Sequence, residues 1–254
     1  GLVAPHIDFE RGHRTYGAAY AALRDQSEAA RFVVLGTAHF ESDAHFIATD
    51  KAYHTPLGPV PTDGELLAQL QERCEQDLLA NQVAHRQEHS VEFQALFIRH
   101  LFADREPKML AVLCPSLEDQ MNEGVSPMAS DAVAEFVRAL RDAIRESPEP
   151  VCVIAGADLS HVGRQFGDPG LSPGLLALAE KEDRAMLGCA EALDAEALYA
   201  AVAKDGDRRH ICGLASIYVL LQSQTFSQGR FLRYEQAVTR ETQSMVSFAA
   251  MAFA

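Results

Sequence analysis

The sequence predicts an α/β fold, a three-layer domain in which a central mostly parallel or mixed sheet is covered by helices. Short apolar runs, typical of buried strands, alternate with longer amphipathic runs, typical of helices, and this alternation favours strands joined through helices. Hydrophobic residues make up 48% of the chain and charged residues 23%, which is enough apolar material for a large core. The Pro/Gly-rich stretches 55–64 and 166–174 are short, as in loops rather than domain linkers, so we expect a single domain over residues 1–254.

Six apolar runs have the length and composition of strands. They are rich in Val, Ile, Leu, Ala and Phe, and Gly, Pro or charged residues lie beside them. The predicted strands are residues 2–5, 31–36, 108–114, 151–157, 230–238 and 245–253. A short connection that contains Arg-Glu-Thr separates the last two, which predicts a hairpin and therefore an antiparallel pair in a mixed sheet.

Seven longer segments repeat apolar residues every three or four positions, which is the period of a helix with one buried face. The predicted helices are residues 16–30, 63–79, 88–102, 131–146, 174–189, 194–203 and 212–224. Because these segments fall between predicted strands, they are expected to cover the sheet.

The charge and the cysteines restrict the classes of partner and compartment. The net charge is −14, from 22 Lys and Arg against 36 Asp and Glu, which disfavours nucleic acid or an anionic membrane as a partner. No apolar stretch approaches the roughly 20 residues that span a bilayer. The five cysteines are odd in number and contain no CxxC pair, and the first residues lack the charged segment of a signal peptide. We therefore expect a cytoplasmic protein; the start at Gly1 rather than Met leaves open whether residues precede it.

Three histidines stand at the ends of predicted strands. His6 closes the first strand, His39 follows the second, and His161 follows the fourth. The carboxyl ends of strands are where open α/β sheets bind ligands, so these side chains are expected to converge on one site. The alternative is that each is a hydrogen-bonded loop residue. Three equivalent positions favour a site.

A fourth candidate is His89, at the start of a predicted helix. Glu88 and Glu92 are four residues apart and share one face of this helix. The alternative is a solvated helix start, where the helix dipole favours acidic residues. The segment from His85 to His89 also reads H-x-x-E-H, the inverted zinc-protease pattern. That pattern needs an unbroken helix over 84–89 and a third ligand downstream, for which the sequence offers no convincing helix.

Cys212 stands at the start of the last predicted helix, with Gly213 directly behind it. A helix N-terminus lowers the pKa of a thiol and favours the thiolate, the form that binds metals. The alternative is a small buried apolar residue, as cysteines commonly are. The residues alone leave both interpretations open. The other four cysteines fall in predicted strands or helices and are expected in the core.

Seven short motifs, in order along the chain, together resemble one known family. They are Ala-Pro-His-Ile-Asp-Phe-Glu-Arg-Gly, Leu-Gly-Thr-Ala-His, Thr-Pro-Leu-Gly, Glu-His-Ser-Val-Glu-Phe-Gln, Ala-Asp-Leu-Ser-His-Val-Gly, Ile-Cys-Gly and Val-Ser-Phe-Ala-Ala-Met. The family is Memo, whose prokaryotic members are also called AmmeMemoRadiSam system protein B, and the likeness runs from Pro5 to about Phe253. The resemblance implies a fold related to class III extradiol ring-cleavage dioxygenases, in which a non-haem iron lies at one end of the sheet.

The resemblance also implies site residues. The metal ligands of Memo proteins fall on His6, His39 and Cys212, and further pocket residues, which we take as catalytic candidates, fall on His89, Asp158 and His161. In the dioxygenases the third ligand is a carboxylate, whereas a cysteine takes its place here. Two histidines and a thiolate form a softer ligand set, so we expect one metal ion, with iron or copper favoured and zinc compatible.

These implications define three hypotheses. The first is a non-haem iron or copper redox enzyme, dioxygenase-like, acting on a small substrate such as an aromatic molecule. In it His161 acts as acid/base or contacts substrate, while Asp158 orients an imidazole or anchors substrate. The second is a non-catalytic metal- or peptide-binding module on a dioxygenase-derived fold. The third is a zinc-dependent hydrolase. The family name further implies a pathway shared with a radical-SAM protein and an AMMECR-type protein.

Overall fold

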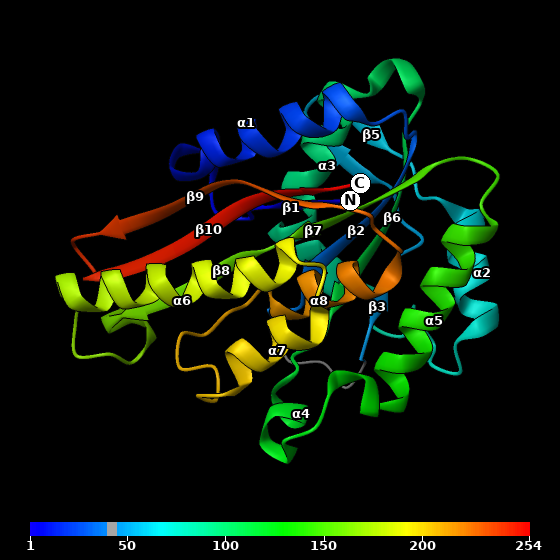
Figure 1. Cartoon of the computed structure of the whole chain (residues 1–254). Coiled ribbons are helices and arrows are strands. Elements are labelled where there is room, and N and C mark those ends of the chain that lie inside the picture. The colour runs from blue at the N-terminus through cyan, green and yellow to red at the C-terminus, as the bar shows by residue number, and fades with distance from the viewer. Residues whose placement is uncertain (40–44) are drawn as a thin grey trace.

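The computed structural model describes residues 1–39 and 45–254, and its middle layer is a mixed sheet with helices on both faces (Figure 1). Within the described ranges the sheet has eight strands in the order β3-β6-β2-β7-β1-β10-β8, with β9 also paired to β10. These strands are β1 (Leu2–Ala4), β2 (Arg31–Thr37), β3 (Ile47–Ala48), β6 (Lys108–Cys114), β7 (Val151–Gly156), β8 (Asp158–Gly163), β9 (Gly229–Thr239) and β10 (Ser244–Phe253). The predicted α/β class is confirmed.

The sheet is parallel at its centre and antiparallel at its margins. Strands β6, β2, β7 and β1 pair in parallel, while β3 runs antiparallel to β6, and β10 runs antiparallel to β1, β8 and β9. The predicted hairpin is the pair β9 and β10. A separate two-stranded sheet consists of β4 (Tyr53–Thr55) and β5 (Gly58–Val60).

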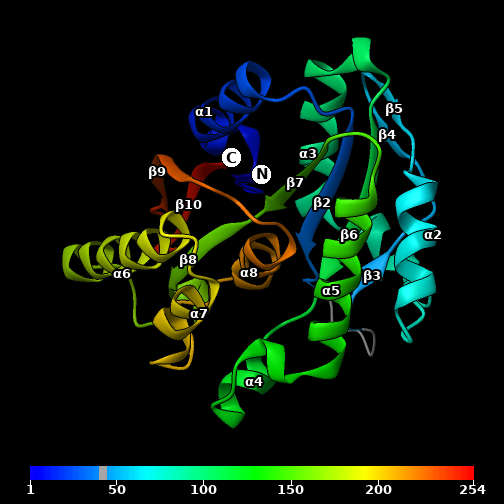
Figure 2. The same ribbon diagram turned by 45° about the vertical axis from the view of Figure 1, so that its right-hand side comes forward.

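Helices bury both faces of this sheet, as Figure 2 shows from a second direction. The described helices are α1 (Phe9–Gln26), α2 (Gly64–Arg73), α3 (His89–Leu101), α4 (Glu118–Glu123), α5 (Asp131–Glu146), α6 (Pro173–Glu191), α7 (Ala195–Ala203) and α8 (Leu214–Ser223), with 3-10 helices at Gln82–Gln87, Ala103–Arg105, Pro127–Ala129 and Arg164–Phe166. Helices α1 and α3 cover one face, and α2, α5, α7 and α8 contribute to the core on the other. No helix among these is long and apolar enough to cross a membrane.

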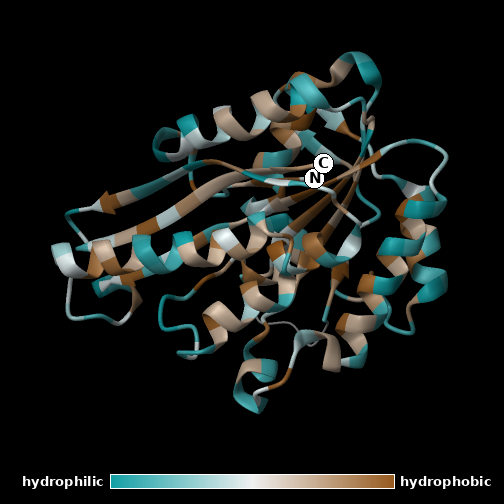
Figure 3. Cartoon of the chain, viewed as in Figure 1, coloured by the Kyte–Doolittle hydropathy of each residue, from teal (hydrophilic) through white to brown (hydrophobic). Residues whose placement is uncertain are grey.

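Strand β2 shows why the strands are so uniformly apolar. Successive side chains of a strand point to opposite faces. Phe32 and Val34 belong to the core beneath α1 and α3, whereas Val33 and Leu35 belong to the core beneath α5 and α8. Because both faces are buried, every residue of β2 is buried as well. Figure 3 shows the resulting pattern, with brown strands inside and teal residues on the outer sides of the helices.

The observed bounds follow the predicted ones most closely where the patterns are longest. Strand β6 and helix α5 begin and end as predicted. The first helix begins earlier, at Phe9, because the Asp8 side chain caps it by accepting the Arg11 N–H. The helix predicted over 63–79 ends at Arg73, since the chain then turns so that the Leu78 carbonyl accepts the Ala48 N–H. The sequence does not predict strands β3, β4, β5 and β8 or helix α4.

One junction in the sheet positions the candidate site. Strand β1 pairs with residues 251–252 of β10, and β8 pairs with the same edge of β10 further along, at residues 244–248. The other edge of β10 is occupied by β9 throughout. Strand β8 therefore lies beside β10 where β1 ends. Pro5 and His6, the residues that follow β1, lie at this junction.

Candidate metal centre

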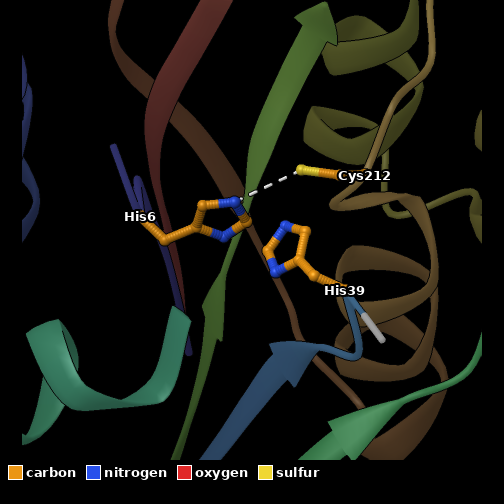
Figure 4. A group of neighbouring side chains, drawn as sticks. All are labelled: His6, His39 and Cys212. Atoms are coloured by element: carbon orange, nitrogen blue, oxygen red, sulfur yellow. Dashed lines mark hydrogen bonds between the residues drawn. The ribbon is translucent and has the colours of Figure 1, made fainter. Parts of the chain in front are cut away.

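Three predicted ligands from distant parts of the chain lie together (Figure 4). His6 follows the end of β1, His39 lies two residues beyond β2, and Cys212 directly precedes Gly213, the N-cap of α8. The His6 and His39 ring centroids are 5.1 Å apart, and Cys212 Sγ lies 3.3 Å from His6 Nε2. One potential ligand atom from each of the three residues lies within 4.8 Å of the others. The predicted convergence of the first two strand ends is therefore present in the fold.

The protonation of His6 is determined by its surroundings. Its Nδ1 lies 2.9 Å from the Gly156 carbonyl oxygen, and because a carbonyl only accepts, we assign the proton to Nδ1. The lone pair is then on Nε2, which faces Cys212 Sγ. Burial and, after it, the nearby His39 together lower the pKa of His6 to about 3, so the ring is neutral. A neutral imidazole with a free Nε2 is the form that binds a metal.

A carboxylate orients His39 in a similar way. Both oxygens of Glu88 lie 3.0 Å from His39 Nδ1, and one also accepts the His39 backbone N–H. Burial alone would raise the pKa of Glu88, but the hydrogen bonds from His39 and from the Ser90 N–H outweigh it and hold the pKa at about 2. The ionised carboxylate fixes the Nδ1 proton of His39 and leaves Nε2 free. Such a carboxylate–histidine pair is a usual support for a metal ligand.

Asp158 holds the backbone of the first ligand. One carboxylate oxygen accepts the N–H of His6 at 2.9 Å and that of Ile7 at 3.2 Å, and the other oxygen lies 3.8 Å from His6 Nε2. Burial raises the pKa of Asp158 to about 6. The role predicted for Asp158, to orient an imidazole or anchor substrate, stays a prediction. Its hydrogen bonds fix the turn after β1, and the Gly156 carbonyl orients the His6 ring.

The prediction that His161 stands at the carboxyl end of the fourth strand was wrong, although His161 does follow that strand, β7, along the chain. His161 lies inside β8, because residues 158–163 pair with β10 and form a strand of their own. Its Nδ1 lies 2.9 Å from the Leu159 carbonyl oxygen and 3.1 Å from that of His210. Burial lowers the pKa of His161, and the charge of Asp158 opposes this shift.

His89 completes a triangle of imidazoles. It is the first residue of α3, and its ring centroid is 5.3 Å from that of His6 and 5.2 Å from that of His39. His39, Glu88 and His89 form a second group whose potential ligand atoms lie within 4.8 Å. In that group, however, the Glu88 oxygens already accept hydrogen bonds from His39 and Ser90.

Burial reverses the expected shift for Cys212. Burial raises the pKa of its thiol well above the usual range, and the Asp158 charge adds to the effect. Burial therefore outweighs the predicted stabilisation of the thiolate by the N-terminus of α8, which begins two residues later at Leu214. The segment is packed tightly against β8: a Cβ on Gly213 would lie 2.4 Å from the Ala157 Cβ and 2.6 Å from the Asp158 carbonyl oxygen. Glycine at this position therefore lets Cys212 approach the histidines.

The H-x-x-E-H pattern lacks the helix that it requires. His85 lies in the 3-10 helix Gln82–Gln87, Glu88 is extended, and α3 begins at His89. Both His85 ring nitrogens are also engaged: Nδ1 lies 2.6 Å from the Tyr53 hydroxyl and Nε2 lies 2.9 Å from the Ile47 carbonyl oxygen. His85 is therefore a structural histidine, and it belongs to neither group of potential metal ligands among the described residues.

A cavity of about 280 Å³ opens beside two of the candidate ligands. Its wall is mostly apolar, with a few polar side chains. The lining includes His39, Leu117, Met121, Asp207, His210, Ile211, Cys212 and Leu214. The sequence does not predict Asp207, His210 or Met121 of α4 as part of the site. The position of His210 two residues before Cys212 was a usable signal, whereas α4 is too short to have given one.

Comparisons with known proteins show the family to which the chain belongs. The chain matches the family described as "Memo-like protein" over residues 1–252. A "MEMO1 family protein" of Aquifex aeolicus is 28% identical over 257 residues, covering 100% of this chain and 63% of that protein. Another of Thermus thermophilus is 30% identical over 192 residues, covering 76% of this chain and 52% of that protein. The chain thus spans between about half and two thirds of the length of these two relatives.

A third relative and one solved structure extend the comparison. A "MEMO1 family protein" of Methanopyrus kandleri is 26% identical and covers 100% of this chain and 82% of that protein. The crystal structure of an uncharacterized protein from Escherichia coli K12 has a TM-score of 0.49 and 14% identity, and the match covers 93% of this chain and 91% of that one.

Proposed function

Since the chain belongs to the Memo family, we propose that His6, His39 and Cys212 bind one iron or copper ion, and that this centre performs redox chemistry on a small substrate. The observation that carries the proposal is that one potential ligand atom from each of these three residues lies within 4.8 Å of the others. His6 Nε2 and His39 Nε2 are left free because Gly156 and Glu88 hold the Nδ1 protons, and Cys212 Sγ lies beside them. The donor set is soft enough for copper and retains the two histidines of non-haem iron sites.

The metal would supply electron transfer and Lewis acidity, and the protein residues would bind, orient and move protons. His161 donates its Nδ1 proton to backbone carbonyls, so its Nε2 carries a lone pair that accepts a proton from a bound substrate. Asp158 and Glu88 keep the two ligand histidines in place. The His89 ring lies 5.3 Å from that of His6 and 5.2 Å from that of His39, close enough to contact a substrate bound at these ligands.

The cavity supports an enzyme over a closed metal-binding module. A module that only stores a metal needs no substrate-sized space, whereas a space of about 280 Å³ lies directly beside His39 and Cys212. This volume is near the lower end of the range of ligand pockets, which favours a small molecule. The apolar wall from Leu117, Met121 and Leu214 fits an apolar body, an aromatic ring included.

The decisive experiment is metal analysis of the anaerobically purified protein, comparing wild type with Cys212→Ser. We expect about one iron or copper per chain in the wild type and little in the variant, because a hydroxyl is a poor ligand at neutral pH. Cys189→Ser is the matched control, since Cys189 lies on α6 and its sulfur contacts the Ala185 carbonyl. His161→Ala should also keep the metal.

Three outcomes would contradict the proposal in different ways. Unchanged metal in Cys212→Ser would remove Cys212 from the ligand set. Loss of metal in His161→Ala would place His161 among the ligands. A wild type that stays metal-free after reconstitution with Fe(II) or Cu(I) would leave the cluster as a pocket without a metal, and the non-catalytic module would become the better hypothesis.

A further inference from the structure

A buried polar network lies on the opposite side of β8 from His161. Ser160 is the neighbour of His161, so its side chain points to the other face of the strand. Its hydroxyl donates to Asp183 of α6 at 2.5 Å, and the same carboxylate accepts from the Ser247 hydroxyl at 2.5 Å and from the Tyr234 hydroxyl at 2.9 Å. Asp183 is fully buried. Its two oxygens therefore tie together α6, β8, β9 and β10.

The same carboxylate forms an ion pair with Arg209. The guanidinium donates through Nη1 to Asp183 and to the Ser160 hydroxyl. Arg209 is 6% exposed, and its Nε and Nη2 have no hydrogen-bond partner in the described part of the chain. Asp183 is thus the carboxylate that compensates a buried positive charge. A buried charge that loses its partner is strongly unfavourable, so Arg209 cannot keep this position without Asp183.

Arg209 is the first residue of the segment 209–213, which contains Cys212. The Arg209 carbonyl accepts the N–H of His161 at 2.6 Å, and the Gly213 N–H donates to the Asp158 carbonyl at 3.1 Å. These bonds fasten the segment 209–213 along the edge of β8 that does not pair with β10, and Cys212 lies between them. Thr37 adds one further contact, from its hydroxyl to the Cys212 carbonyl at 3.0 Å.

We propose that Asp183 is a positioning residue for the metal centre: by holding Arg209 from the opposite side of β8, it holds Cys212 Sγ and the backbone of His161 in place. This proposal rests on the proposed function for its chemical meaning. Asp183 is neither one of the proposed ligands nor a hydrogen-bond partner of one, so this role is additional to those already described.

The test compares Asp183→Asn with a matched control, Asp63→Asn. Asp63 forms another deeply buried ion pair, with two contacts of 2.6 Å to Arg31, at the opposite end of β2 from His39. The probe is Co²⁺, whose bond to a thiolate gives an absorption band. We expect Asp183→Asn to weaken Co²⁺ binding about 10-fold or more and to reduce the thiolate band. Asp63→Asn should lower the melting temperature but leave the Co²⁺ affinity and the thiolate band unchanged.

A second readout requires no metal. The rate at which a small alkylating reagent modifies Cys212, located by mass spectrometry in the metal-free protein, should rise in Asp183→Asn and not in Asp63→Asn. If wild type gives no thiolate band but this rate rises, the proposed function fails while the positioning role stands. If Asp183→Asn has the Co²⁺ affinity, the thiolate absorption band and the Cys212 alkylation rate of the wild type, the positioning role is overturned. The proposed function is then unaffected. Equal changes of Co²⁺ binding and alkylation rate in Asp183→Asn and Asp63→Asn would also overturn the positioning role, because such changes would reflect the loss of overall stability alone.

Should Asp183→Asn not fold, the double variant Asp183→Asn/Arg209→Gln replaces it. Removing both charges leaves no unpaired buried ion, so the fold is expected to tolerate this change better. The tether between α6 and the segment 209–213 is still weakened, and reduced Co²⁺ affinity and a faster alkylation of Cys212 are again expected. Wild-type values of both in the double variant would contradict the proposal.

Discussion

Individual residues control which atoms the two histidine ligands present. The Gly156 carbonyl and the Glu88 carboxylate each hold an Nδ1 proton, and so determine that Nε2 faces the site. Neither group needs to touch a metal to affect its binding. The two supports differ in kind: a backbone carbonyl cannot be removed by substitution, whereas the Glu88 side chain can. The orientation of His39 is therefore the more easily tested of the two.

Glu88→Gln is expected to weaken metal binding about 10- to 100-fold, the usual effect of losing a carboxylate behind a histidine ligand. The neutral amide accepts the Nδ1 proton of His39 more weakly than the carboxylate does. Affinity is measured by competition with a chelator of known strength. Glu92→Gln is the control, because it removes the same charge one turn later on α3, at an exposed position. Equal affinities of Glu88→Gln and wild type would show that Glu88 does not support the ligand.

At the scale of elements, close packing between β8 and the start of α8 determines where Cys212 lies. Gly213 allows this approach, and its N–H donates to the Asp158 carbonyl. Helix α8 is almost entirely buried, so it cannot move away without opening the core. A side chain at position 213 therefore has to displace the cysteine or the strand.

Gly213→Ala should reduce the free energy of unfolding by about 1–3 kcal/mol, the usual cost of overpacking, and should also weaken metal binding. Urea unfolding and chelator competition measure the two effects. Gly188→Ala on α6 is the control: no atom lies within 4 Å of its added Cβ, and alanine in a helix should stabilise by about 0.5–1 kcal/mol. A Gly213→Ala protein as stable as wild type would mean that the junction is not tightly packed.

Elements with long, regular patterns could be predicted, and short or polar ones could not. The apolar run of β6 and the helical period of α5 gave correct bounds. Strand β8 was missed because Asp158, Ser160 and His161 make it polar and because it continues directly from β7. In the site, the strand ends predicted the meeting of His6 and His39. Nothing in the sequence pairs Glu88 with His39, or Asp183 with Arg209, since these contacts arise only from tertiary packing.

For the whole molecule, the candidate centre exists only in the folded chain. Strand β1 lies between β7 and β10, so both termini take part in the same sheet, and the Gly1 and Phe253 backbones pair with each other (Figures 1 and 2). The ligands follow β1, β2 and the connection before α8. An unfolded chain cannot bring these segments together, and a ligand that binds only the native state stabilises it.

A free metal concentration of about 100 times the dissociation constant should therefore add about 2.7 kcal/mol to the free energy of unfolding. For a chain of this size that corresponds to a rise in melting temperature of roughly 5–10 °C. Anaerobic calorimetry with and without Fe(II) measures the shift. The Cys212→Ser variant should show little of it, and an equal rise in that variant would indicate binding at some other place in the molecule.

The junction at the end of β1 makes the length of one strand critical. Strand β1 stops at Ala4, and β8 continues beside β10 from there. One residue added to β1 would carry His6 about 3.3 Å along the strand and turn its side chain to the opposite face. The hairpin of β9 and β10 lies at the far end of its strands, with Thr239 opposite Ser244, and can grow without reaching this point. The length of β1, three residues, therefore determines where the imidazole of His6 lies in the fold.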